Sequence, residues 1–184
     1  SYVIQNDAYL ITCGTYLSSS VHGAITLAGH GSIQYAYIVA YAVDDGASNP
    51  WGQRIATTAT ISINQLALDK LGETLFAVGK TIGTATFYGS SNIITTDTGF
   101  YLATYTITSS AIEIHSVQLG IGTSEAHNVA YSSATSAVIV SGVFTTTLSV
   151  GSKHHYPQTV TSSSDAGFVA LYTVGNRFCD CQRG

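Results

Sequence analysis

Apolar and polar residues alternate with a period of two along much of the chain. Residues 57–63 show this pattern most clearly, because threonine, alanine, isoleucine and serine follow one another with many β-branched side chains. Similar stretches occur at 36–43, 74–78, 84–87, 101–107, 137–140 and 168–174. Clusters of turn-forming residues separate them, at 44–46, 89–92, 109–110 and 162–165. The pattern predicts an all-β protein built from antiparallel strands.

Two sequence motifs occur three times each. The first is the segment 168–174, Phe-Val-Ala-Leu-Tyr-Thr-Val, which echoes segments 37–43 and 101–107. The second aromatic residues of the three copies are Tyr41, Tyr105 and Tyr172, at intervals of 64 and 67 residues. The second motif ends in a glycine, at Gly14, Gly79 and Gly142, with intervals of 65 and 63 residues. Self-similarity at a fixed period determines the architecture, so we predict one domain, 1–184, of three units with about four strands each.

The phase of the two motifs suggests that the chain is cut within a unit. Residues 1–30 carry the second half of a unit, 31–98 and 99–160 carry two whole repeats, and 161–184 carry only a first strand. The last strand either pairs with residues 1–30 of its own molecule and closes a barrel-like or propeller-like ring, or the missing strand comes from another subunit. The residues predicted for such strand exchange are Tyr2, Val3, Ile4, Phe168, Val169, Leu171 and Tyr172.

The composition favours a surface of hydroxyl groups. Charged residues make up only 9% of the chain, against a usual share of about 25%, while serine and threonine supply roughly a quarter. Such a surface suits packing against copies of the same chain or O-linked glycosylation. The alternative is that the threonines only reflect their preference for strands.

Charge and hydropathy argue against two classes of partner. With a net charge of −4 and six scattered lysines and arginines, the sequence has no basic stripe for nucleic acid. No apolar run approaches the ~18 residues of a membrane span. The absence of methionine and the first residue, Ser1, fit a mature secreted chain, so we expect an extracellular or cell-surface location.

The three cysteines suggest a covalent tie between the chain ends. Cys13 lies near the beginning, whereas Cys179 and Cys181 lie near the end. In an oxidising compartment a bridge from Cys13 to one of the pair is expected. The alternative is a reduced, buried Cys13 and an unconstrained tail.

The repeated unit resembles the SBBP-type β-propeller repeat, in three divergent and circularly shifted copies. The matching residues are Asp165-Ala166-Gly167-Phe168-Val169-Ala170-Leu171-Tyr172, then Trp51, then Leu66-Ala67-Leu68-Asp69 and Leu75-Phe76-Ala77-Val78-Gly79-Lys80-Thr81. The resemblance implies an extracellular protein of four-stranded blades. The units here are longer than those of the family, and three blades are fewer than a propeller needs to close.

Few residues suggest catalysis or metal binding. His154 and His155 are the best candidates for a metal or acid–base pair, but adjacent strand residues point to opposite faces. The segment Asp44-Asp45-Gly46 lacks the alternating acidic ligands of a calcium loop and is expected to be a turn. The repeated tyrosines suggest either sugar-stacking platforms or core packing. We therefore predict neither an enzyme nor a cofactor.

Together these observations predict a structural subunit of an extracellular fibre or pilus-like filament, assembled with copies of itself by β-strand exchange. The alternative is a secreted carbohydrate-binding or adhesive module, whose partners are glycans. A secreted hydrolase is a third and weaker interpretation, because the ten acidic residues form no suggestive cluster.

Overall fold

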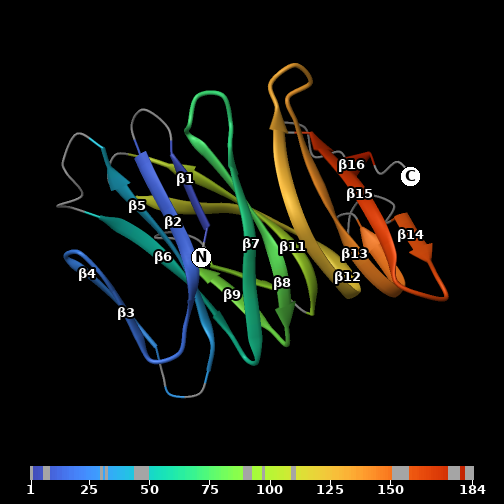
Figure 1. Ribbon diagram of the computed structural model, residues 1–184, viewed down its shortest axis with the longest axis horizontal. Helices are drawn as coiled ribbons and strands as arrows, with labels where there is room; N and C mark the ends of the chain where they lie inside the picture. Colours follow the sequence, from blue (N-terminus) through green and yellow to red (C-terminus); the bar gives the residue numbers. More distant parts are fainter. Residues whose placement is uncertain are drawn as a thin grey trace.

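A computed structural model describes residues 2–5, 9–29, 31, 33–43, 50–88, 93–96, 98–108, 111–150, 158–173 and 179–180. Every regular element in these residues is a β-strand, and all strand pairs are antiparallel (Figure 1). The predicted all-β, antiparallel fold is therefore confirmed. The strands form three successive four-stranded meanders, which lie side by side along the long axis of the molecule.

The first meander forms most of one sheet. Its neighbouring strands are β1 (Tyr2–Gln5), β2 (Tyr9–Tyr16), β5 (Tyr35–Ala42) and β6 (Trp51–Thr57). The hairpin of β9 (Ala85–Tyr88) and β10 (Ile93–Thr96) extends this sheet beyond β6. A separate hairpin, β3 (Ser19–His22) with β4 (Ile25–Ala28), is inserted between β2 and β5.

The other two meanders share the long strand β12 (Ile112–Ser132) in one continuous sheet. The second meander consists of β7 (Thr60–Leu68), β8 (Thr74–Ile82), β11 (Gly99–Ile107) and the first part of β12. The third consists of the later part of β12, then β13 (Ala137–Val150), β15 (Ala166–Thr173) and β16 (Cys179–Asp180). The short β14 (Gln158–Thr161) pairs with the end of β13.

The two sequence motifs pair with each other in the same register in all three meanders. Each glycine lies directly opposite the first aromatic residue of the other motif. The three pairs are Gly14–Tyr37, Gly79–Tyr101 and Gly142–Phe168. The repetition in the sequence is therefore a repetition of cross-strand geometry.

Each meander begins with the strand that precedes the glycine motif. The last strand of the repeated motif, β15, pairs with β13 and briefly with β16, and not with β1 or β2. Of the two alternatives, pairing of the final strand with residues 1–30 of the same molecule is therefore not present in the structure. The sequence motifs had located the strands but not the point at which a meander starts.

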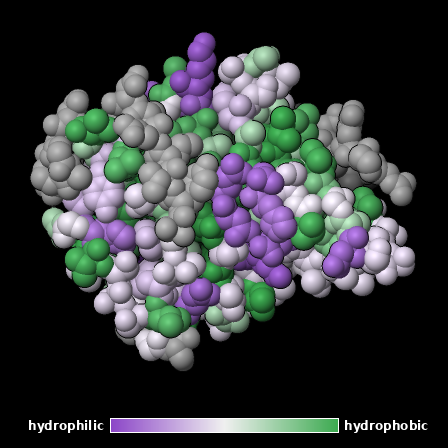
Figure 2. Space-filling view, viewed as in Figure 1, coloured by the Kyte–Doolittle hydropathy of each residue, from purple (hydrophilic) through white to green (hydrophobic). Residues whose placement is uncertain are grey.

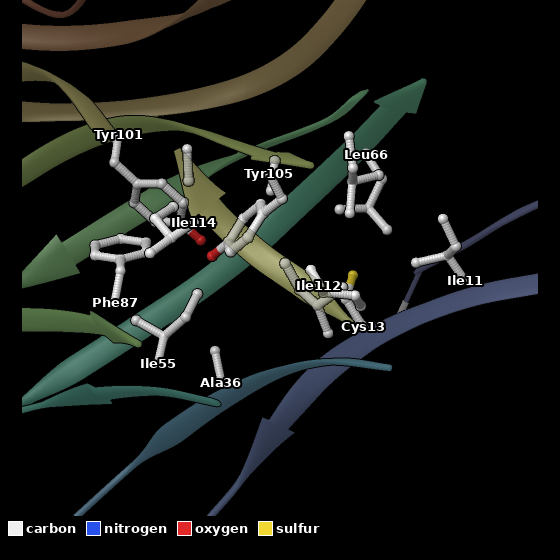
Figure 3. Packing of buried hydrophobic residues seen from close by; sticks show 14 of the residues in the cluster. Ile11, Cys13, Ala36, Ile55, Leu66, Phe87, Tyr101, Tyr105, Ile112 and Ile114 are labelled. Atoms are coloured by element: carbon white, nitrogen blue, oxygen red, sulfur yellow. The ribbon is translucent and has the colours of Figure 1, made fainter. Parts of the chain in front are cut away.

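The second meander has apolar side chains on both faces. Leu75 and Ala77 of β8 point into a first core cluster shared with the first meander, whereas Phe76 and Val78 point into a second cluster shared with the third. Because β1 contacts β7 and β10 contacts β12, the strands around the first cluster form a nearly closed barrel. Figure 3 shows side chains from strands on both sides of this barrel meeting inside it.

β-bulges occur at equivalent places in the second and third meanders. The register of β7 shifts after Ile63, which lies opposite Gly79, and the register of β12 shifts after Ala126, which lies opposite Gly142. A bulge adds one residue to a strand and redirects its side chain. The extra residues are Asn64 and His127, and both take part in the polar cluster described below.

Candidate assembly surfaces and polar sites

The predicted exchange strand β1 lies at an edge of the first sheet. All four of its residues pair with β2, from Tyr2 opposite Cys13 to Gln5 opposite Leu10. The strand also contacts β7 and so closes the barrel on that side. The side chains of Tyr2, Val3 and Ile4 are not among those that the structure describes. The backbone position of β1 shows that this strand lies between β2 of one sheet and β7 of the other.

The other predicted exchange residues, in β15, divide between two faces. Phe168 and Tyr172 point into the second core cluster, where the Phe168 ring stacks on Phe100 with ring centres 4.8 Å apart. Val169 and Leu171 point away from it and are 53% and 37% exposed. Only the latter two side chains are accessible to a partner.

One edge of β15 is incompletely paired among the described residues. Its counterparts β5 and β11 have a neighbouring strand on each side, β2 and β6 for one, β8 and β12 for the other. On the side away from β13, β15 pairs only through Leu171 with Asp180 and Tyr172 with Cys179. Residues 166–170 have no described strand on this side. In the described part of the chain, the strand that follows β15 comprises two residues, Cys179 and Asp180.

The outer face of the third meander carries exposed apolar side chains in register. Ile139 lies directly opposite Leu171, and Val169 lies opposite Ser141. Ile139 is 38% exposed, and Val143, four residues further along β13 on the same face, is 40% exposed. Four large apolar side chains from two neighbouring strands therefore share one accessible surface, which we call the third-sheet face.

A polar cluster centred on Glu125 connects the second and third meanders. Asn64 Nδ2 donates to Glu125 Oε1 at 2.9 Å and to the backbone oxygen of Ala126 at 2.8 Å. Lys80 Nζ lies 4.0 Å from Glu125 Oε2, and His127 Nε2 lies 3.8 Å from Glu125 Oε1. No sequence pattern indicated this cluster, because two β-bulges that a period of two does not reveal bring its members together.

A neighbouring side chain completes the edge of β12. The backbone N–H of Val129 donates to Gln65 Oε1 at 2.7 Å. Asn64 and Gln65 thus satisfy backbone groups on the edge of β12 that faces β7. In Figure 2, hydrophilic side chains gather in the middle of the visible face, over the region that β7, β8 and β12 occupy in Figure 1. The cluster serves as a polar seam between two apolar cores.

The hollow beside this seam is small. Lys80, Ser124, Glu125, Phe144 and Thr145 are among the residues that line a shallow cleft of about 70 Å³. A cleft of this size holds a few water molecules and is far below the ≈ 300–1,000 Å³ of typical small-molecule sites. The arrangement suits structural hydrogen bonding better than substrate binding.

Tyrosines gather on the outer face of the first meander. The rings of Tyr16 and Tyr35 stack at 5.4 Å, and the His22 ring lies 4.4 Å from that of Tyr37. Burial lowers the pKa of His22, whose Nδ1 lies 3.3 Å from the Tyr41 hydroxyl. The hairpin β3–β4 carries His22 and packs over these tyrosines.

The other repeated tyrosines belong to the cores. Tyr105 is fully buried in the first cluster, and Tyr172 is buried in the second. Figure 3 shows the hydroxyl ends of Tyr101 and Tyr105 directed toward one another. Burial raises the pKa of both tyrosines; Tyr105 and Cys13 raise the pKa of Tyr101 further, and Cys13 raises that of Tyr105 further. Of the three repeated tyrosines, only Tyr41 is partly exposed.

Cys13 and Cys179 lie in different sheets. Cys13 is buried in the first core cluster, while Cys179 follows β15 at the edge of the other sheet. The side chain of Cys179 and all of Cys181 lie outside the described residues, so the bridge stays a prediction. His154, His155 and the segment 44–46 also lie outside the described residues, so the interpretations of them stay predictions.

The described residues contain neither a metal-ligating cluster nor a membrane-spanning helix. They contain no group of three or more histidine, cysteine, aspartate or glutamate side chains that could hold a metal ion. Nor do these parts of the chain contain a helix of the length and hydropathy that crossing a membrane requires.

Comparison with known proteins gave no relative: no protein-family model, curated protein or solved structure matches this chain. The resemblance to SBBP-type repeats therefore stays an interpretation of the sequence motifs.

Proposed function

We propose that the protein is a structural subunit of an extracellular fibre or surface filament, in which β1 of one copy takes the place of β1 in the next. The observation that carries this proposal is the position of β1. It makes its four backbone pairs with β2 and its other contact with β7, and so closes the barrel. A strand of identical sequence from another copy makes the same contacts.

Strand exchange of this kind has a low energetic cost. Exchanging an identical element conserves the native contacts, and a head-to-tail exchange that does not close into a ring grows into a fibre. The surface of this chain offers little resistance, because only 9% of its residues are charged and charged side chains normally protect sheet edges. Among the described residues, 166–170 of β15 have no strand on the side away from β13, which makes this edge a second place where backbone groups can accept a strand.

A cysteine pair between β1 and β2 distinguishes exchange from closure within one molecule. Val3 lies directly opposite Thr12, so the double variant Val3→Cys, Thr12→Cys should form a disulfide after oxidation. The three native cysteines are replaced by serine. Exchange predicts a ladder of covalent oligomers on non-reducing gels. Each single variant, as control, gives no species larger than a dimer. A cross-linked monomer as the sole product would refute the proposal.

The tyrosine cluster of the first meander favours carbohydrate binding as a second candidate function. Tyr37 and Tyr41 are partly exposed and lie beside His22, a combination of aromatic surface and hydrogen-bonding groups suited to sugars. Trp51 is less suitable, because it packs on the first core and its ring N–H is buried. Binding to neutral oligosaccharides that is lost in Tyr41→Ala but kept in Tyr131→Ala, in a particle that stays monomeric, would favour this function.

A further inference from the structure

The three meanders pack through equivalent faces. Counted from the motif glycine, the third and first preceding residues are Ile11 and Cys13 in the first meander and Phe76 and Val78 in the second. Ile11 and Cys13 point into the core cluster shared with the second meander. Phe76 and Val78 point into the cluster shared with the third. Each of the first two meanders thus uses the same face to pack on the next.

In the third meander this face has no described neighbour. The residue equivalent to Ile11 and Phe76 is Ile139, which is 38% exposed although its counterparts are 0% and 1% exposed. Leu171 and Val169 belong to the same face of the neighbouring strand. The face by which the chain has twice packed on a copy of its own unit is therefore available a third time.

The opposite end of the stack is already covered. There, the hairpin β3–β4 packs on the outer face of the first meander. Tyr16 Oη donates to the backbone oxygen of Ala28 at 3.3 Å, Arg54 Nη1 donates to the same oxygen at 2.9 Å, and the His22 ring lies against Tyr37. On this part of the surface the hairpin occupies the position that a second copy would take. The third-sheet face of one molecule is therefore expected to contact the third-sheet face of another.

We propose that the third-sheet face, centred on Ile139, Val169 and Leu171, packs against the same face of a second copy about a twofold axis. The inference rests on the proposed self-assembling role, but the contact is separate from the exchanged strand. It would join two filaments sideways, whereas the exchange of β1 would extend each one.

The side chains of this face suit such self-pairing. Across the strands, Ala130, Ile139 and Leu171 form one row, and Asn128, Ser141 and Val169 form the next. From Ala130 to Leu171 the first row contains no charge, and the second row contains none, so a twofold contact brings no like charges together at its centre. Asp180 continues the first row beyond Leu171, and Glu125, opposite Val143, lies at the margin of the face. An apolar centre with a polar rim is the usual anatomy of a protein interface.

The test uses the disulfide-locked monomer of the Val3→Cys, Thr12→Cys chain, because its β1 cannot exchange. Its mass is measured by light scattering coupled to size exclusion over a dilution series. We expect a reversible dimer. In the same background Val169→Lys with Leu171→Lys should weaken self-association at least about a hundredfold, because both charges would be buried at the contact. Val21→Lys, on the exposed side of the hairpin where Val21 is 69% exposed, is the matched control and should leave the dimer intact.

The outcomes separate this inference from the proposed function. A locked chain that stays monomeric at every concentration, or a dimer that survives both lysines, overturns the inference, whatever the cross-linked ladder shows. If oxidation gives no cross-linked monomer because every β1 strand is exchanged, the double variant Val169→Lys, Leu171→Lys is compared with Val21→Lys by electron microscopy of the filaments. The filaments should then be paired in Val21→Lys and single in the double lysine variant. Filaments that remain paired in the double lysine variant overturn the inference.

Discussion

Gly142 of β13 lies directly opposite Phe168 of β15, and the Phe168 ring covers the glycine. A Cβ atom on Gly142 would lie 2.8 Å from a carbon of that ring and would also collide with the backbone oxygen of Glu125. The pairs Gly14–Tyr37 and Gly79–Tyr101 have the same arrangement. An aromatic ring over a cross-strand glycine protects the backbone and fixes the register, so the repeated motifs specify how strands align.

A methyl group at Gly142 should destabilise the third meander. Gly142→Ala forces the backbone of β12 away and should cost about 1–3 kcal/mol, measured by urea denaturation. Gly167→Ala is the matched control, since its Cβ would meet its nearest atom, the Gly142 oxygen, at an ordinary 3.9 Å. Equal stability of the two variants would show that the glycine–aromatic pair does not set the register.

Removal of the Gln65 side chain should weaken the seam between the second and third meanders. Gln65→Ala leaves the backbone N–H of Val129 without its acceptor, for an expected cost of about 1–3 kcal/mol. The rate of amide hydrogen exchange at Val129 should also increase in this variant, because the N–H loses its hydrogen bond. The exposed Asn128, with a long 3.4 Å contact to Ser141, provides the comparison: Asn128→Ala should change the free energy of unfolding by less than about 0.5 kcal/mol.

Two buried tyrosines should respond differently to loss of the hydroxyl. Tyr101 donates to the backbone oxygen of Ser62 at 2.8 Å, so Tyr101→Phe should cost about 1–2 kcal/mol. The hydroxyl of Tyr105 is buried with no hydrogen-bond partner among the described residues, so Tyr105→Phe should be neutral or stabilising. Thermal unfolding of the two variants checks the order, and a costlier Tyr105→Phe would contradict the described core.

Alkaline pH should destabilise the protein through the same pair. Burial raises the pKa of Tyr101 and Tyr105 above the ordinary 10.0, so the unfolded chain loses these protons first. The free energy of unfolding should therefore be constant below about pH 10 with respect to these groups and fall as the pH rises above it. Tyr105→Phe should make this fall shallower in denaturation curves recorded from pH 8 to about 11. An unchanged slope would mean that Tyr105 ionises equally in both states.

The sequence predicted the strands better than their connections. The two motifs located real strands. The segment 57–63, where alternation is clearest, instead crosses the bend at 58–59 between β6 and β7. The run Leu75–Gly79 is apolar on both faces, since β8 lies between two cores. The number of repeats in the sequence does not reveal that β8 lies between two cores. The starting point of each meander depends on which neighbouring strands pair, which the spacing of motifs does not determine.

The candidate sites were predicted only in part. Val169 and Leu171 are accessible, but their immediate neighbours on the strand, Phe168 and Tyr172, pack into the core. Alternation alone would separate these pairs, yet it does not say which face is solvent. The seam at Glu125 required two bulges and contacts between Asn64 and a residue 61 positions later. No local pattern carries that information.

Direct imaging of the native particle tests the central claim, that copies of this chain assemble through β1. Negative-stain electron microscopy and light scattering are applied to the intact chain and to a chain lacking residues 1–5. The account predicts filaments for the intact chain, and particles without filaments for the shortened chain, with its β-sheet circular dichroism largely kept. A closed monomer at high concentration of the intact chain would contradict it.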